Sequence, residues 1–305
     1  MAQFPDEQSD DGSFERQEDA FRDWVRRDPH SEFPVRAGRY HLYVSLACPW
    51  AHRTVILREL LGLWEAIGMT VVDPIRNDED GWAFREGDGG DPVNGFKWLK
   101  EAYLATNPDY SGRVTVPVLW DTERGRIVSN SDDDLMRMFN DEFREFSNTA
   151  WDFCPASRLA EIDRLNELVF ENINDGVYKA GFASSQRAYE DAVLALFDSL
   201  DQLETRLGRS RFLLGDQIVE TDIRLFVTLI RFDAVYHGHF KCNLRRIVDY
   251  PNLTRFLSEI REIEGVEETI DFDHIKRHYY VTHDDINPSG IVPVGPDGAV
   301  TILGR

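Results

Sequence analysis

The sequence contains little cysteine, little lysine and no long hydrophobic run. Its 305 residues include 3 Cys and, among 34 basic residues, only 5 Lys beside 29 Arg. Three dispersed thiols are too few for a disulfide scaffold in a chain of this size, and a membrane-spanning helix needs about 20 consecutive apolar residues. The acidic segment before residue 36 has no apolar core of a secretory signal. We therefore expect a cytoplasmic protein without a membrane partner.

The chain also lacks a positive excess. It carries 34 Lys plus Arg against 55 Asp plus Glu, a formal net charge of −21. Such a surface repels phosphate backbones, which excludes nucleic acid as a general partner. Dense carboxylates keep a protein hydrated in concentrated salt but repel one another in dilute buffer. With 32 Asp among the 55 acids, the composition favours a salt-rich, halophilic cytosol, and an ordinary acidic protein is the alternative.

Two kinds of pattern divide the chain. With 42% hydrophobic and 12% aromatic residues it can bury a full core, and its length predicts two domains. Strand and helix patterns alternate in the first half and only helical patterns follow. The expected strands are His41–Leu46, Met69–Ile75, Val114–Trp120 and Arg126–Val128, and the expected helices are a segment after Pro49, Asp132–Asn140, Leu159–Ile173, Ala188–Leu207, Asp222–Tyr236 and Leu253–Glu262. We also expect a flexible loop at Glu86–Asp91 and an extended strap at Ile286–Pro296.

The most informative motif is Cys48-Pro49-Trp50-Ala51. A cysteine at the start of a helix faces unpaired N–H groups and the positive end of the helix dipole, which favour the thiolate. Cys48 is thus a candidate nucleophile, with a buried structural thiol as the alternative. A dithiol redox site would carry a second cysteine at position 51, where this chain has alanine, so an external thiol must resolve any mixed disulfide on Cys48. We expect the other two cysteines, Cys154 and Cys242, to be packing residues.

Several long blocks together resemble one family. Residues 38 to 297 resemble the glutathionyl-hydroquinone reductases, the Xi class of glutathione transferases. The blocks that carry the resemblance are Val44–Thr54, Gly81–Phe84, Thr115–Trp120, Gly176–Phe182, His239–Asn243 and Ile286–Pro293. The resemblance implies an α/β, thioredoxin-like N-terminal domain with an all-helical glutathione-transferase C-terminal domain, and a homodimer. The expected divisions are an N-terminal extension at 1–37, a thioredoxin-like thiol-binding domain at 38–150, and the helical domain with its strap at 151–305.

The resemblance also implies a reaction. Cys48 would attack the sulfur of a thiol-hydroquinone adduct, the hydroquinone would leave, and a second small thiol would clear the mixed disulfide in a ping-pong cycle. Tyr178 and Tyr279 would contact the substrate hydroxyls, with Tyr280 as a neighbour. The partners are then a small-molecule thiol and a quinol adduct, with no bound cofactor. The histidines have no spacing suited to zinc, and we expect no metal.

Residues of the thiol site follow from the same resemblance. Pro117 occupies the position of the thioredoxin-like cis-proline, whose preceding residue presents its backbone to a peptide-like ligand. Val116 would therefore anchor the cysteine moiety of the thiol, and Trp82 would pack beside it. Considered alone, each of these residues is more often part of a core.

Two departures from the family pattern affect the expectations. Where the family has a Glu-Ser pair for the γ-glutamyl end, this chain reads Ser131-Asp132. Ser131 could take the carboxylate and Asp132 or Asp133 the amine, or this could be a solvated acidic helix start; the co-substrate is accordingly glutathione or γ-glutamylcysteine. In the helical half, Val219 replaces a Ser or Thr cap, so either Thr221 caps the helix or the helix starts differently.

Two other functions stay open at this point. A related transferase-fold thiol reductase, acting on dehydroascorbate or on glutathionylated proteins, would use Cys48 in the same way. A non-enzymatic interaction module would not need it. The sequence does not place Arg53, His278 and His283, which could neutralise substrate charge or lie on the surface.

Overall fold

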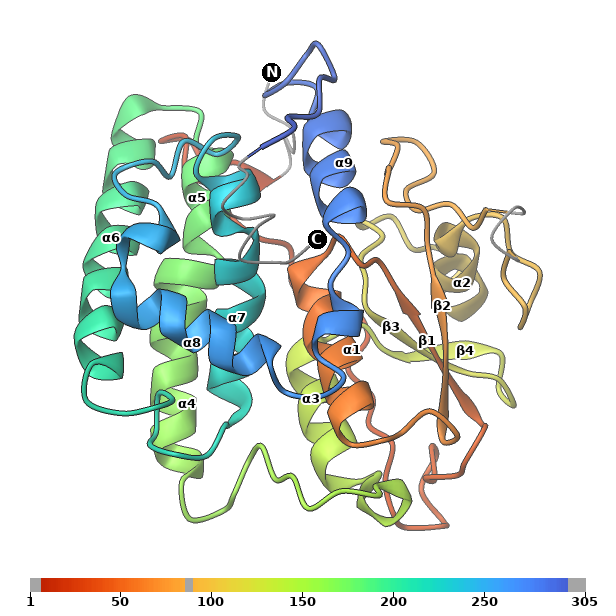
Figure 1. The fold of residues 1–305 in the computed structure, drawn as a ribbon. Coiled ribbons are helices and arrows are strands. Elements are labelled where there is room, and N and C mark those ends of the chain that lie inside the picture. The colour runs from red at the N-terminus through yellow and green to blue at the C-terminus, as the bar shows by residue number, and fades with distance from the viewer. Residues whose placement is uncertain (1–6, 86–89, 296–305) are drawn as a thin grey trace. The chain divides into compact units, whose positions relative to one another are not determined.

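The computed structural model describes residues 7–85 and 90–295, which form two compact units (Figure 1). The sheet unit contains residues 18–152 and 268–274, and the helical unit contains the described residues of 7–17, 153–267 and 275–295. The segment expected as a single N-terminal extension, 1–37, is therefore divided between the two units. The expected loop at Glu86–Asp91 lies largely outside the described residues.

The sheet unit has a thioredoxin-like arrangement. Its elements are β1 (Tyr40–Val44), α1 (Pro49–Leu60), β2 (Ile67–Val71), α2 (Leu99–Thr106), β3 (Val118–Asp121), β4 (Arg126–Ser129), α3 (Asp132–Asp141) and the 3₁₀ turn η3 (Arg144–Phe146). The strand order is β2-β1-β3-β4, with β1 parallel to β2 and the other pairs antiparallel. Figure 1 shows α1 and α3 together on one face of the sheet and α2 on the other.

Local chemistry explains where these elements begin. All five residues of β1 are buried, as expected for a central strand rich in aromatic and aliphatic side chains. Pro49 opens α1, where its missing N–H costs nothing. The predicted strand Val114–Trp120 is too long at its start, because Pro117 cannot donate to a strand ladder and β3 begins only at Val118. The predicted strand Met69–Ile75 lies instead at Ile67–Val71, in register with β1.

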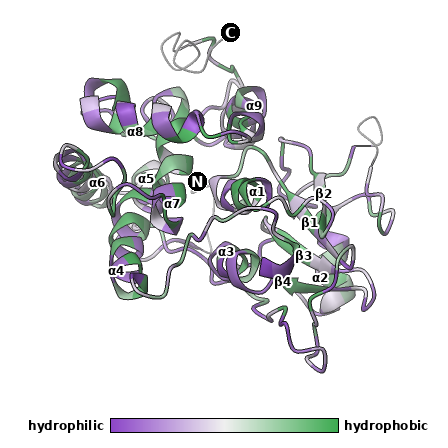
Figure 2. Cartoon of the chain, turned by 60° about the horizontal axis from the view of Figure 1, so that its bottom comes forward, coloured by the Kyte–Doolittle hydropathy of each residue, from purple (hydrophilic) through white to green (hydrophobic). Residues whose placement is uncertain are grey.

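The helical unit consists of amphipathic and buried helices. Its elements are α4 (Leu159–Val169), the π-helical turn η4 (Phe170–Asn174), α5 (Gly176–Gly181), α6 (Gln186–Leu207), α7 (Glu220–Arg231), the π-helical turn η5 (Phe232–Tyr236), η6 (Ile247–Asp249), α8 (Pro251–Arg261), η7 (Glu267–Thr269) and α9 (Phe272–Thr282), the last two extending into the sheet unit. In Figure 2 hydrophilic and hydrophobic residues alternate along α4, α6 and α8, the pattern of helices with one buried face. Helix α7 is buried at all twelve positions.

The start of α7 resolves the question raised by Val219. The helix begins at Glu220, and Asp222 accepts hydrogen bonds from the backbone N–H groups of Val219, at 2.8 Å, and Leu213, at 2.9 Å. Thr221 does not cap the helix, because its hydroxyl donates to Asn166. Asp222 thus caps the backbone N–H of Val219 as in a capping box, but Val219 has no hydroxyl to cap the helix in return.

The C-terminal tail follows α9. From Ile286 to residue 295 it forms turns and irregular backbone without helix or strand. The Asn287 side chain donates to the carbonyls of Tyr280 and Ile291, and Lys276 donates to the carbonyl of Val294. The tail therefore lies against α9; it has no helix, as expected, but part of it forms turns and is not an extended strap. Among the described helices, none combines the length and the hydropathy that crossing a membrane requires.

Candidate active site

Cys48 occupies the N-cap position of α1. Its backbone is extended, with φ −77° and ψ 122°, and no side chain caps the helix. The thiol is partly exposed and donates to the carbonyl of Val116, with Sγ and O 3.6 Å apart. Cys154 and Cys242 are buried, as predicted, and burial raises the pKa of Cys242. Of the three thiols, only Cys48 is thus placed to react with a ligand.

Of the residues expected to hold the thiol, Val116 contacts Cys48. The Val116–Pro117 peptide bond is cis, and the contact of Cys48 with the Val116 carbonyl places this turn beside the nucleophile. Trp82 is 5% exposed, and its carbonyl accepts from the N–H of Leu99. The roles of Val116, Pro117 and Trp82 in binding a thiol stay predictions.

The beginning of α3 carries a compact set of charges. Ser131 is its N-cap, and its hydroxyl accepts from the N–H of Asp134 at 3.4 Å. The Arg53 guanidinium, 1% exposed, lies 2.7 Å from a carboxylate oxygen of Asp132 and 3.3 Å from one of Asp133. It also lies over the Trp50 ring, 4.5 Å from the centroid. Arg53, which had no predicted role, therefore pairs with the acidic start of α3.

Asp19 completes this acidic cluster, and sequence reasoning missed it. Partial desolvation and then repulsion from Asp132 raise its pKa to about 7, while a hydrogen bond with Ser131 opposes the rise. The negative charge of Asp133 also raises this pKa. The Asp19 side chain is still exposed to solvent. Asp19 is separated from Ser131 by more than a hundred residues, and no local sequence signal could have joined them.

The helical unit brings Tyr178 and Tyr279 together. Their hydroxyl oxygens are 2.6 Å apart, and that of Tyr236 is 2.9 Å from Tyr279. All three side chains are buried, and burial raises the pKa of Tyr236 and Tyr279 well above the ordinary value. Tyr236 was not predicted. It ends the π-helical turn η5, and such turns are frequent at functional sites.

Tyr280 does not belong to this hydroxyl chain. Its hydroxyl donates to the carbonyl of Ala234 at 3.3 Å, and its ring lies 4.8 Å from that of His239. Its expected place beside the substrate stays a prediction.

Buried histidines border the tyrosines. Nε2 of His239 is 3.1 Å from Nδ1 of His283, whose ring centroid is 5.5 Å from that of Tyr279. Burial and then the charge of Lys241 lower the pKa of His239 to about 4, so this ring is neutral at pH 7. His278, 9% exposed, lies on α9 with its ring centroid 5.6 Å from that of His283. His278 and His283 are therefore buried and do not lie on the surface.

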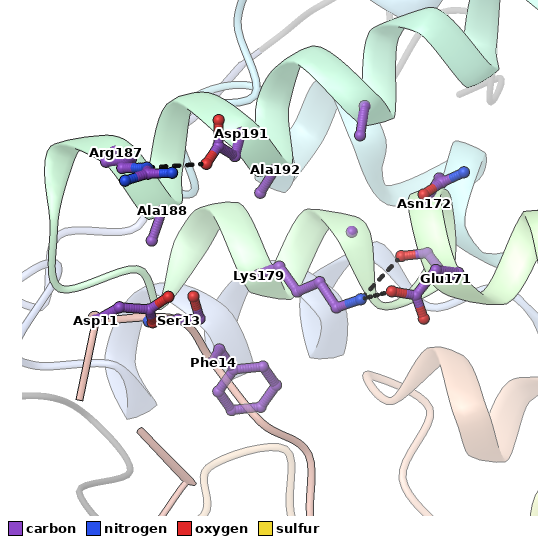
Figure 3. A pocket seen from close by; sticks show the side chains of 12 residues that line it. Asp11, Ser13, Phe14, Glu171, Asn172, Lys179, Arg187, Ala188, Asp191 and Ala192 are labelled. Atoms are coloured by element: carbon purple, nitrogen blue, oxygen red, sulfur yellow. Dashed lines mark hydrogen bonds and ion pairs between the residues drawn. The ribbon is translucent and has the colours of Figure 1, made fainter. Parts of the chain in front are cut away.

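A cavity of about 460 Å³ lies elsewhere in the helical unit (Figure 3). It is lined by residues of the N-terminal segment, η4, α5 and α6, and Figure 3 shows Lys179 directed toward Glu171 and Arg187 toward Asp191. It contains none of the residues predicted for the site. Within 7–85 and 90–295, no three His, Cys, Asp or Glu side chains are grouped so as to hold a metal ion.

Comparison with known proteins gives consistent matches over most of the chain. Residues 47–142 match the glutathione S-transferase N-terminal domain, and residues 186–259 match the glutathione S-transferase C-terminal domain. The chain is 47% identical over 293 residues to glutathionyl-hydroquinone reductase PcpF from Sphingobium chlorophenolicum, covering 95% of this chain and 92% of that protein.

Two solved structures show the same fold. The glutathione-bound structure of YqjG from Escherichia coli K-12 superposes with a TM-score of 0.87 at 48% identity, covering 91% of this chain and 92% of that one. A Xi class glutathione transferase from Natrialba magadii superposes with a TM-score of 0.88 at 48% identity, covering 91% and 85% of the two chains.

Proposed function

The chain belongs to the glutathionyl-hydroquinone reductases, the Xi class of glutathione transferases, and on this premise we propose that it removes a thiol group reductively from thiol-hydroquinone adducts through Cys48. One observation carries this mechanism. Cys48 is a partly exposed thiol at a helix N-cap beside the Val116–Pro117 turn, with Ala51 in place of a resolving cysteine. A single thiol in this position favours mixed-disulfide chemistry over dithiol exchange.

The proposed reaction has two half-reactions. The Cys48 thiolate attacks the sulfur of the adduct, an S–S bond forms, and the bond between sulfur and the aromatic carbon breaks. The electron pair of that bond stays on the ring carbon, which takes a proton, so the ring is reduced while the two sulfurs are oxidised to a mixed disulfide. The thiolate of a second small thiol then attacks this disulfide, releasing the Cys48 thiolate and a disulfide of two small thiols.

The first half-reaction requires a proton donor. Tyr178 can supply one, because its hydroxyl is hydrogen-bonded to that of Tyr279, which in turn contacts that of Tyr236. Such a chain lets a proton lost from the first hydroxyl be replaced by the next. The raised pKa values of Tyr279 and Tyr236 keep these groups protonated at pH 7. We assign Tyr178 and Tyr279 to the substrate hydroxyls.

The thiol co-substrate follows from the start of α3. A related structure binds glutathione, and γ-glutamylcysteine shares its γ-glutamyl end without the glycine carboxylate. We propose that this end lies at Ser131 and Asp132, with the Ser131 hydroxyl turning from Asp19 to the carboxylate of the ligand and the surrounding acids binding its ammonium group. Turnover with the two thiols in high KCl tests the choice: a strong preference for glutathione would reject the shorter thiol.

A salt-rich setting is a further part of the proposal. It is supported by the 55 acidic residues and the 5 Lys of the chain. If mutual repulsion of carboxylates limits stability in dilute buffer, the melting temperature should rise with added KCl. A melting temperature that is unchanged by KCl would favour an ordinary acidic protein. The homodimer, expected from the resemblance, is tested by light scattering of the purified chain.

Mass spectrometry tests the central proposal. Wild type and Cys48→Ala are incubated with a thiol-menadione or thiol-hydroquinone adduct in high KCl, and free quinol is quantified in parallel. Cys242→Ala is the matched control, since it removes a buried thiol and keeps Cys48. We expect quinol release with a thiol-sized mass on Cys48 in wild type and control, and neither in Cys48→Ala.

Other outcomes would identify the alternatives. A mass gained from small disulfides without release of quinol would indicate a general transferase-fold thiol reductase. An unreactive Cys48 would indicate a non-enzymatic interaction module.

A further inference from the structure

Arg16, near the N-terminus, lies against Tyr178 in the helical unit. Its guanidinium carbon is 4.8 Å from the centroid of the Tyr178 ring and 5.4 Å from that of Phe14. A cation over the face of an aromatic ring is attracted by its π electrons. Neither the sequence patterns nor the resemblance singled out Arg16.

Asp175 holds this guanidinium in place. Nε of Arg16 is 2.6 Å from Oδ1 of Asp175, a carboxylate that is 6% exposed and lies just before α5. Lys179 does not compete strongly with Arg16 for the Asp175 carboxylate, because it pairs with Glu171 (Figure 3) and its Nζ lies 3.9 Å from Asp175. The backbone N–H of Tyr178 donates to the carbonyl of Asp175, so one short turn presents both the carboxylate and the ring to Arg16.

The segment that carries Arg16 is tied to the end of α5. Gln8 and Phe14 form an antiparallel bridge, and the Gln8 side chain donates to the carbonyl of Phe182 at 3.0 Å. The N–H of Ser184 donates to the carbonyl of Gly12, and the Phe14 ring lies 5.3 Å from that of Phe182. These contacts hold the segment that carries Arg16 against the end of α5, which also carries Tyr178.

Arg16 stays charged beside Tyr178. The pKa of Arg16 is raised in spite of its desolvation, through attraction to Asp175 and then to Tyr178. The charged and titratable groups around the pair are Glu7 and Arg16 of the N-terminal segment, Asp175 and Lys179 of the α5 region, Tyr236 of η5 and Tyr279 of α9. Of these, Arg16 is the cation that lies over the ring.

We propose that Arg16 is a positioning residue for Tyr178: it fixes the ring and stabilises the phenolate formed when Tyr178 gives its proton to the substrate. The proton moves to the hydroquinone as the bond between carbon and sulfur breaks, and the phenolate is reprotonated through Tyr279. This inference rests on the proposed function. It adds the N-terminal segment to the groups that control the first half-reaction.

The first test separates the two half-reactions. Arg16→Gln removes the charge, Arg16→Lys keeps it, and Arg187→Gln removes an arginine that is 93% exposed as a matched control. Since a partly desolvated cation–π contact contributes about one tenfold step in an equilibrium, we expect Arg16→Gln to slow quinol release about tenfold. Arg16→Lys should recover part of the loss. Reduction of a small disulfide by Cys48, which needs no phenol, should stay within about twofold.

The second test does not depend on activity. The ultraviolet titration of the Tyr178 phenol is isolated by subtracting Tyr178→Phe from the parent protein, with and without Arg16→Gln. Loss of the cation should move the midpoint upward by about one pH unit, the equivalent of a tenfold change. An unmoved midpoint, or equal loss of both half-reactions, would overturn the inference. If Arg16→Gln moves the midpoint but the wild type releases no quinol, the proposed function is overturned instead, because Arg16 and Tyr178 would then be coupled without the reaction.

Discussion

Asp19 gives a prediction whose sign and size follow from the acidic cluster at the start of α3. Its pKa is raised from 3.8 to about 7, so the folded protein holds this proton more tightly than the unfolded chain does. Stability contributed in this way is complete below about pH 4 and is lost as the pH rises to about 7. Replacement of Asp19 by Asn removes the ionisation and should therefore stabilise the protein at pH 8 and change little at pH 4.

The size of the effect is limited by solvent. Three pKa units would correspond to about 4 kcal/mol for a fully desolvated group. Asp19 is exposed, and screening reduces such an interaction to about 1 kcal/mol. That gain corresponds to a rise in melting temperature on the order of 2 °C for a chain of this size.

Thermal melts at pH 4 and pH 8, in one fixed KCl concentration, measure this difference. Glu18→Gln removes a charge from the exposed neighbouring residue and serves as the control. A lower melting temperature of Asp19→Asn at pH 8, or an equal effect at both pH values, would show that the Asp19 carboxylate does not destabilise the folded protein.

Three further substitutions test other parts of the structure. Asp222→Ala leaves two buried N–H groups without their acceptor, so the free energy of unfolding measured in urea should fall by about 3 kcal/mol. Asp216→Asn changes an exposed residue and should cost little; equal effects would contradict the capping role. Tyr236→Phe removes one neutral hydrogen bond to Tyr279, so the rate of quinol release should fall about fivefold. The reduction of small disulfides should not change. An unchanged rate of quinol release would show that Tyr236 does not take part in proton transfer. Gly181→Ala would place a methyl group against the Phe240 ring and should lower the free energy of unfolding by about 2 kcal/mol. Gly176→Ala, the control, makes only ordinary contacts. Equal melting temperatures of the two variants would refute the predicted clash.

Much of the sheet unit could be predicted because its signals are local. The strand before Cys48, the helix that Pro49 opens and the helix over Asp132–Asp141 depend on residues adjacent in sequence. Three helices were missed. Helix α2 has only eight residues, α5 begins and ends with glycine, and α9 is rich in histidine and tyrosine, residues with moderate to low helix propensity.

The candidate site was predictable only where a motif marked it. Cys48 and Tyr178 lie in blocks that resemble the family, whereas Arg16 and Asp19 lie outside every such block. Their partners lie far along the chain, 159 residues away in the case of Arg16 and Asp175. Tyr236 likewise meets Tyr279 across 43 residues, a pairing that helical periodicity does not specify.

A single turnover without a second thiol tests whether Cys48 is the nucleophile. Wild type is mixed with a thiol-hydroquinone adduct, quenched in acid, and analysed for free quinol and for the mass of the Cys48 peptide. We expect one quinol to be released for each thiol bound to Cys48, and no further quinol until a second thiol is added. Quinol release by Cys48→Ala at the wild-type rate, or release in wild type without a thiol on Cys48, would contradict it.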